Sequence, residues 1–160
     1  MARALIVGCG CRGRELGAFL QSDGWSVRGT SRSSAGVDAI VAAGLEGVAA
    51  DPDRLDTVLD HIGDIAVIAW LMGSASGEPA SAVNGERLES LMIRLVDTPV
   101  RGFVYEAAGS APAAELRRGT SIVEAAAERW RIRVALLRAE PRESGWNVAA
   151  ADAVSSVIGS

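Results

Sequence analysis

Residues 3–32 read RALIVGCGCRGRELGAFLQSDGWSVRGTSR, and this stretch decides the fold. It opens with a short apolar run, residues 4–7, whose length and β-branched content are typical of a buried parallel strand. A glycine loop follows directly, and apolar residues then recur at helical spacing as far as residue 20. Residues 26–30 have the pattern of a second strand. The order strand, glycine loop, helix, strand is the context in which such a loop indicates dinucleotide binding.

The glycine loop has the pattern Gly8-x-Gly10-x-x-Gly13, and each glycine has a separate role. Gly8 permits the tight turn after the strand, Gly10 lets the backbone approach a pyrophosphate, and Gly13 lets the helix pack closely on the strand. The free N–H groups at the start of that helix then face the phosphates. The alternative is a chance pattern in a chain with 18 glycines, but its register with the first strand favours a binding loop.

The composition limits the function classes. The 160 residues suit one domain over 1–160, and the net charge of −4 comes from acids and bases that are mixed along the chain. Because no basic face results, we expect no nucleic-acid partner. The apolar runs are too short to span a bilayer and no signal peptide is evident, so we expect a soluble, cytoplasmic protein without a membrane partner.

Missing residue types restrict the chemistry further. All 16 basic residues are Arg, so a Schiff-base lysine is excluded, and no lysine can lower the pKa of the single tyrosine, Tyr105. The two cysteines, Cys9 and Cys11, are poorly spaced for a disulfide, and two ligands alone make no zinc site, so we predict no metal centre. They are either small residues that the loop tolerates or a redox-sensitive pair at a helix N-terminus. We interpret His61 as a solvated surface residue.

The rest of the chain alternates strands with helices. We predict strands at 47–50, 64–70, 101–105 and 133–138, and helices at about 34–43, 55–62, 80–96, 121–130 and 146–158. Asp51 is expected to cap the helix before residue 62, with Pro52 as its first helical residue. Six strands in this order predict an α/β, doubly wound parallel sheet of the Rossmann type, with strand order 3-2-1-4-5-6.

Ligands of such sheets bind beyond the carboxyl ends of the strands. Two loops rich in small residues fall there, at 71–79 and 106–112, and Trp70 ends the strand before the first of them. Trp70 is therefore a candidate cofactor contact. The alternative for either loop is a plain connection.

The end of the second strand predicts a preference for NADP, with NAD as the other option. NAD-selective proteins of this fold place an acid there, whereas this chain has Thr30, Ser31 and Arg32. Hydroxyls and a guanidinium are donors suited to a 2′-phosphate, and Arg12 in the glycine loop could reach the same group. Cys11, beside it, is a further candidate contact. The alternative is that Arg32 is only a solvated residue before a helix cap.

The stretches 6–16 and 24–32 resemble the atypical and extended short-chain dehydrogenases, in particular the NAD-dependent epimerase/dehydratase-like proteins. The resemblance continues more weakly at Asp51, which is similar to the family's adenine-contacting Asp, and at 130–141 and 152–154. It implies a nicotinamide dinucleotide cofactor. It also implies a homodimer formed by the helices that start near 80 and 121.

The chain departs from that family at its catalytic positions. The family uses a Tyr-x-x-x-Lys pair on the helix after strand five, but residues 115–124 contain neither residue type, and we expect no substrate lobe after strand six. Tyr105, with Ser110 and the Glu106 carboxyl nearby, is a possible proton-transfer site, although a tyrosine without a cation is a poor base at pH 7. More simply, Tyr105 packs with its hydroxyl in water. Two hypotheses remain: a nucleotide-binding protein without the usual pair, or an NADP-dependent oxidoreductase or epimerase with a non-standard site near Tyr105.

Overall fold

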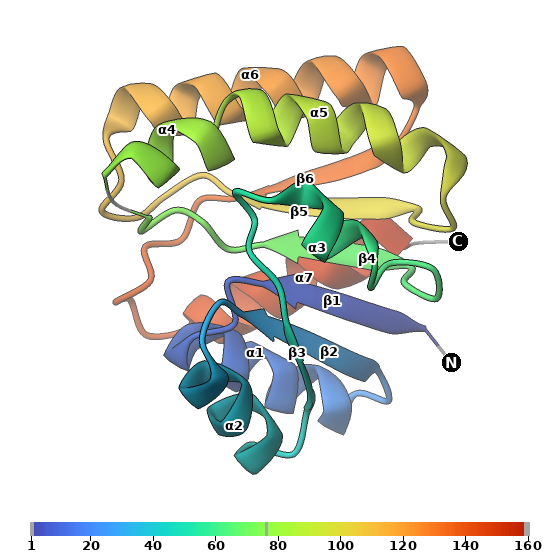
Figure 1. Ribbon diagram of the computed structural model, residues 1–160, viewed down its shortest axis with the longest axis vertical. Coiled ribbons are helices and arrows are strands. Elements are labelled where there is room, and N and C mark those ends of the chain that lie inside the picture. Colours follow the sequence, from blue (N-terminus) through green and yellow to red (C-terminus); the bar gives the residue numbers. More distant parts are fainter. Residues whose placement is uncertain (1, 76, 159–160) are drawn as a thin grey trace.

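The computed structural model describes residues 2–75 and 77–158. Within them, all the strands form one parallel sheet of order β3-β2-β1-β4-β5-β6 (Figure 1). This confirms the predicted doubly wound α/β sheet and its strand order. The strands are β1 (Arg3–Val7), β2 (Ser26–Ser31), β3 (Glu46–Ala49), β4 (Val67–Trp70), β5 (Gly102–Glu106) and β6 (Arg133–Leu137).

Helices cover both faces of the sheet. Figure 1 shows α4, α5 and α6 over one face and α1, α2 and α7 on the other side. No helix in the described part of the chain is long and apolar enough to cross a membrane. The helices are α1 (Cys11–Ser22), α2 (Ser34–Ala42), α3 (Leu55–Leu59), α4 (Glu78–Val83), α5 (Glu86–Arg94), the 3-10 helix η1 (Leu95–Asp97), α6 (Ala113–Trp130) and α7 (Trp146–Ile158).

The alternation of side chains along β1 creates two cores. Ala4 and Ile6 pack into the core that contains α1 and α7, whereas Leu5 and Val7 pack into the core beneath α5 and α6. All four side chains are fully buried because β1 lies inside the sheet, between β2 and β4. The strand order reverses at β1 and β4, so the carboxyl ends of these two strands border the crevice where this fold binds ligands.

The predicted single helix over 80–96 is wrong. The chain forms α4 and α5 instead, with Asn84 and Gly85 between them. Asn84 is fully buried: its Nδ2 donates to the Ala80 carbonyl at 2.9 Å, and its Oδ1 accepts from the Tyr105 hydroxyl at 2.6 Å. This contact with β5 holds Asn84 at the end of α4. It joins residues distant in sequence, so local periodicity could not reveal it.

Two helix starts also differ from the prediction. α3 begins at Leu55, not at Pro52, because the Asp51 carboxylate accepts from the backbone N–H of Asp53 at 2.9 Å and forms a local turn. Asp51 is therefore not the helix cap. α6 begins at Ala113 rather than near 121. Its small residues hide the helical periodicity, and Gly119 lies where a Cβ would collide with the Tyr105 hydroxyl of β5.

Candidate functional site

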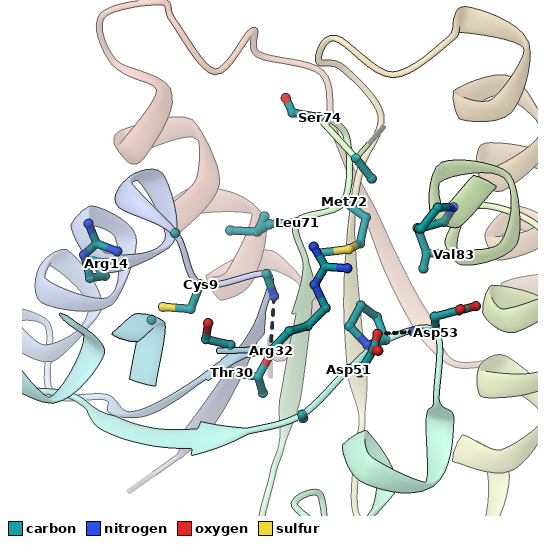
Figure 2. A pocket seen from close by; sticks show the side chains of 18 residues that line it. Cys9, Arg14, Thr30, Arg32, Asp51, Asp53, Leu71, Met72, Ser74 and Val83 are labelled. Atoms are coloured by element: carbon teal, nitrogen blue, oxygen red, sulfur yellow. Dashed lines mark hydrogen bonds between the residues drawn. The ribbon is translucent and has the colours of Figure 1, made fainter. Parts of the chain in front are cut away.

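A pocket of about 430 Å³ lies at the carboxyl ends of β1 to β4 (Figure 2). Its wall is drawn from the glycine loop, the ends of β2 and β3, and the loop after β4. The lining residues are Gly8, Cys9, Gly10, Arg14, Thr30, Ser31, Arg32, Gly36, Ala50, Asp51, Pro52, Asp53, Leu71, Met72, Ser74, Ala75, Pro79 and Val83.

The glycine loop has the backbone geometry expected of it. Gly8 has φ +82°, a left-handed conformation, and a Cβ there would lie 2.6 Å from the Leu71 carbonyl oxygen. Gly10 is the N-cap of α1, and its missing Cβ leaves open space with no atom within 4 Å. Because no side chain caps α1, the first N–H groups of this helix are available to an anion.

Gly13 and Cys9 lie on the inner side of the loop. A Cβ at Gly13 would lie 3.2 Å from the Ile6 side chain and 3.3 Å from the Cys9 sulfur, so the glycine permits α1 to pack closely on β1. Burial raises the pKa of the Cys9 thiol to about 12, although the charge of Arg14 acts the other way. Cys9 is therefore a protonated, packed thiol at neutral pH, which gives no support to a redox-sensitive pair with the exposed Cys11.

The end of β2 forms the polar side of the pocket. Backbone N–H groups of the glycine loop donate to Thr30: Gly8 to its Oγ1 at 3.4 Å and Cys9 to its carbonyl at 3.1 Å. Figure 2 shows the Arg32 side chain extending into the pocket toward Met72. Among the described residues Arg32 has no ion pair, so its guanidinium donors are free for a ligand.

The sequence-predicted contacts are only partly brought together. Arg12 and Cys11 do not line the pocket, and Arg12 pairs with Glu15 at 3.3 Å. Arg14 lines the pocket instead, one helical turn after Gly10, and that spacing could have identified it. Trp70 is also outside the lining: its ring is buried, and its Nε1 donates to the Val83 carbonyl at 3.1 Å.

Sequence reasoning missed the far wall of the pocket. Asp53 follows Asp51 and Pro52 after β3, while Met72 and Ser74 come from the loop after β4. The fold places this loop opposite the end of β2, as Figure 2 shows. The sequence indicated that the loop 71–79 borders a ligand site, but it did not indicate which residues of this loop line the pocket.

The structure does not present Tyr105 to the pocket. Its side chain is fully buried, so the expectation of a hydroxyl in water is wrong. Burial, with the charges of Glu106 and Glu115, raises the pKa of Tyr105 above its usual value, which makes the phenol a weaker acid. Ser110 is an exposed residue of the loop after β5, and its N–H donates to the Ser74 hydroxyl at 3.5 Å.

Glu106, the last residue of β5, is a buried carboxyl beside the pocket wall. Its Oε1 accepts from the Gly73 N–H at 2.8 Å. Burial and the charge of Glu140 raise the pKa of Glu106 to about 7, even though the Gly73 hydrogen bond favours the carboxylate. The same Gly73 accepts from the Ala111 N–H at 2.9 Å, so the loops after β4 and β5 are tied together.

No protein-family profile matches the chain, and no curated protein sequence matches it. Solved structures do share its fold. Yeast methylglyoxal/isovaleraldehyde reductase, solved with NADPH, superposes with a TM-score of 0.63 at 15% identity, covering 86% of this chain and 54% of the reductase. Alfalfa (Medicago sativa) vestitone reductase gives 0.66 at 18% identity, with 85% and 56% covered.

An epimerase shows the same likeness. UDP-glucose 4-epimerase from Brucella ovis, solved with NAD, gives a TM-score of 0.70 at 14% identity, covering 86% of this chain and 51% of the epimerase. The chain thus spans about half the length of the structures it matches. The likeness is one of fold: this chain and these reductases and epimerases share the doubly wound parallel sheet with helices on both faces.

Proposed function

We propose that this chain binds NADP(H) in the pocket at the carboxyl ends of β1 to β4, and that Arg32 contacts the 2′-phosphate. The observation that carries the proposal is the unpaired Arg32 side chain in the pocket, at the end of a strand that supplies no carboxylate. Thr30 and Ser31 add hydroxyls on the same side. The structures with NADPH and NAD on the same fold support a nicotinamide dinucleotide as the ligand class.

The remaining walls suit the rest of such a ligand. The pyrophosphate would lie at Gly10, against the uncapped N-terminus of α1, with Arg14 one turn further along the helix. The Asp51 side is suited to the adenine, since a carboxylate can accept from its amino group. A volume of about 430 Å³ is in the range of small-molecule sites.

As to catalysis, we propose a nucleotide-binding protein that lacks the Tyr-x-x-x-Lys pair of the short-chain dehydrogenases. Residues 115–124 contain no Tyr and no Lys, and the chain contains no Lys at all. The alternative, an oxidoreductase or epimerase that acts through Tyr105, gains no support, because the Tyr105 hydroxyl is buried against Asn84. We expect no turnover of the usual short-chain dehydrogenase kind.

Calorimetric titration of NADPH and NADH tests the proposal. Hydrogen bonds to charged groups contribute about 1.5–3 kcal/mol, so Arg32→Ala is expected to weaken NADPH about tenfold to a hundredfold and to leave NADH nearly unchanged. Arg94→Ala, which removes an exposed arginine of α5 outside the pocket, is the matched control and should change neither. If Arg32→Ala lowered the affinity for NADPH and for NADH equally, the proposed contact between Arg32 and the 2′-phosphate would be contradicted.

The glycine loop has its own test. Gly10→Glu places volume and negative charge in the open space where the pyrophosphate is expected, so a folded variant should bind neither nucleotide. Unchanged affinity in that variant would show that the ligand does not lie on this loop.

A further inference from the structure

A second cavity lies beside the first, at the carboxyl ends of β5 and β6. It has a volume of about 580 Å³, and small residues of the loop after β5 line it: Ala107, Ala108, Gly109 and Ala111. Arg117 and Thr120 of α6 form one side, and Arg138 and Glu140, just after β6, form the other. We refer to this cavity as the second groove.

Two arginines from different elements face this groove. Arg117 and Arg138 are both exposed, and neither forms an ion pair with any residue in the described ranges. Glu140 is the one carboxylate among the described lining residues, so the lining carries more positive than negative charge at neutral pH. Guanidinium groups are planar forks of donors that match the oxygens of carboxylates and phosphates.

The second groove and the nucleotide pocket share a wall. Met72 and Ser74 line the pocket, Ala108 and Gly109 line the second groove, and Gly73 lies between them. Gly73 is packed so closely against Gly109 that a Cβ on Gly109 would collide with the Gly73 carbonyl. Only this wall would therefore separate a ligand in the second groove from one in the pocket at the ends of β1 to β4.

We propose that the second groove binds a small anionic molecule, a carboxylate or a phosphate ester, through Arg117 and Arg138. Thr120 contributes a hydroxyl whose proton is donated to the Leu116 carbonyl at 2.9 Å, which leaves its oxygen as an acceptor for the ligand's polar groups. That this ligand is held beside NADP(H) rests on the proposed function; anion binding in the second groove does not.

Backbone-amide NMR with inorganic phosphate and with succinate as separate probes tests the inference, against sodium chloride of equal ionic strength. We expect saturable shifts of amides 107–111 with at least one probe, and the tighter probe distinguishes a phosphate from a carboxylate ligand. Arg117→Gln and Arg138→Gln should each weaken that binding about tenfold, because each removes charge-assisted hydrogen bonds. Arg94→Gln should not weaken it.

The same variants separate this inference from the proposed function. Arg117→Gln and Arg138→Gln should keep wild-type NADPH affinity, which also shows that they are folded, and Gly10→Glu should keep anion binding in the second groove while it loses NADPH. Unaltered phosphate and succinate binding in the Arg117 and Arg138 variants would overturn the inference. So would shifts confined to the glycine loop and Arg32, or shifts that chloride reproduces.

Discussion

Glu106 has an unusual environment for an acid at the end of a strand. Its carboxyl is buried, close to Glu140, and it holds the Gly73 N–H of the neighbouring loop. Its pKa of about 7 lies above the ordinary value of 4.5, so the folded protein binds this proton more tightly than the unfolded chain does. The stability that follows from proton binding is complete below pH 4.5 and is lost as the pH rises toward 7.

Glu106→Gln removes this titration but keeps an oxygen that can accept from Gly73. Wild type should therefore lose up to about 3 kcal/mol of stability relative to the variant between pH 4.5 and 8. Urea unfolding of both proteins across that range measures the difference. A constant difference at all pH values would show that Glu106 is ionised in the folded protein at an ordinary pKa.

Tyr105 is expected to contribute to stability and not to nucleotide binding. Tyr105→Phe leaves the buried Asn84 Oδ1 without its donor, which should cost about 1–3 kcal/mol in the free energy of unfolding. NADPH affinity should stay within about twofold, because Tyr105 does not line the pocket. Should the chain prove to catalyse a reaction, a hundredfold loss of turnover in a stable Tyr105→Phe protein would place the chemistry at this residue after all.

At the level of elements, local patterns predicted what depends on local physics. The apolar runs of β1 and β4, the glycine loop between β1 and α1, and the helix predicted at about 34–43 follow from residues close in sequence, and the structure confirms these elements. The break between α4 and α5 depends on the Asn84–Tyr105 contact, and the early start of α6 lies in a stretch of small residues. The same holds for the pocket. Its lining residues at the ends of β1 and β2 could be predicted from local sequence, whereas the position of Met72 opposite them depends on the assembled sheet.

The packing of α6 on β5 gives an element-scale prediction. Alanine favours a helix over glycine by about 1 kcal/mol, yet Gly119→Ala should destabilise the protein by about 1–3 kcal/mol, because its Cβ would collide with the Tyr105 hydroxyl. Chemical unfolding measures the change. Ser155→Ala, at an exposed position of α7, is the control and should be nearly neutral. A stabilised Gly119→Ala protein would mean that α6 shifts freely on the sheet.

Across the whole molecule, the arginines near the amino ends of the strands differ in their ion pairing from those near the carboxyl ends. At the amino edge Arg28 is held by Asp64 at 2.7 Å and Glu46 at 2.9 Å, and Arg3 bonds to the same two acids. These contacts lower the pKa of Asp64 and raise that of Arg28. At the carboxyl edge Arg32, Arg117 and Arg138 have no ion pair in the described parts of the chain. The arginines at the amino ends of the strands are therefore held by acids, whereas these three arginines at the carboxyl ends have no acidic partner among the described residues.

The homodimer stays a prediction at this scale. Ile93 of α5 and Val96 are each 51% exposed, and Ile93 borders an apolar depression that Met92, Ile122 and Trp130 also line. Light scattering at high micromolar concentration is expected to show a dimer, and Ile93→Arg, at an exposed position, should shift it to a folded monomer. A monomer for wild type under these conditions would contradict the prediction.

The thiol of Cys9 is packed between Gly13 and Gly29 and has a pKa of about 12, so its rate of chemical modification can measure how often the glycine loop opens. A thiol reagent should label the exposed Cys11 at once, and then Cys9 only as often as the loop opens. The slow phase therefore reports loop opening without any introduced label, and Cys11→Ser isolates it. Saturating NADPH should lengthen that phase, because the bound form stays closed; an unchanged rate would place the nucleotide away from the loop.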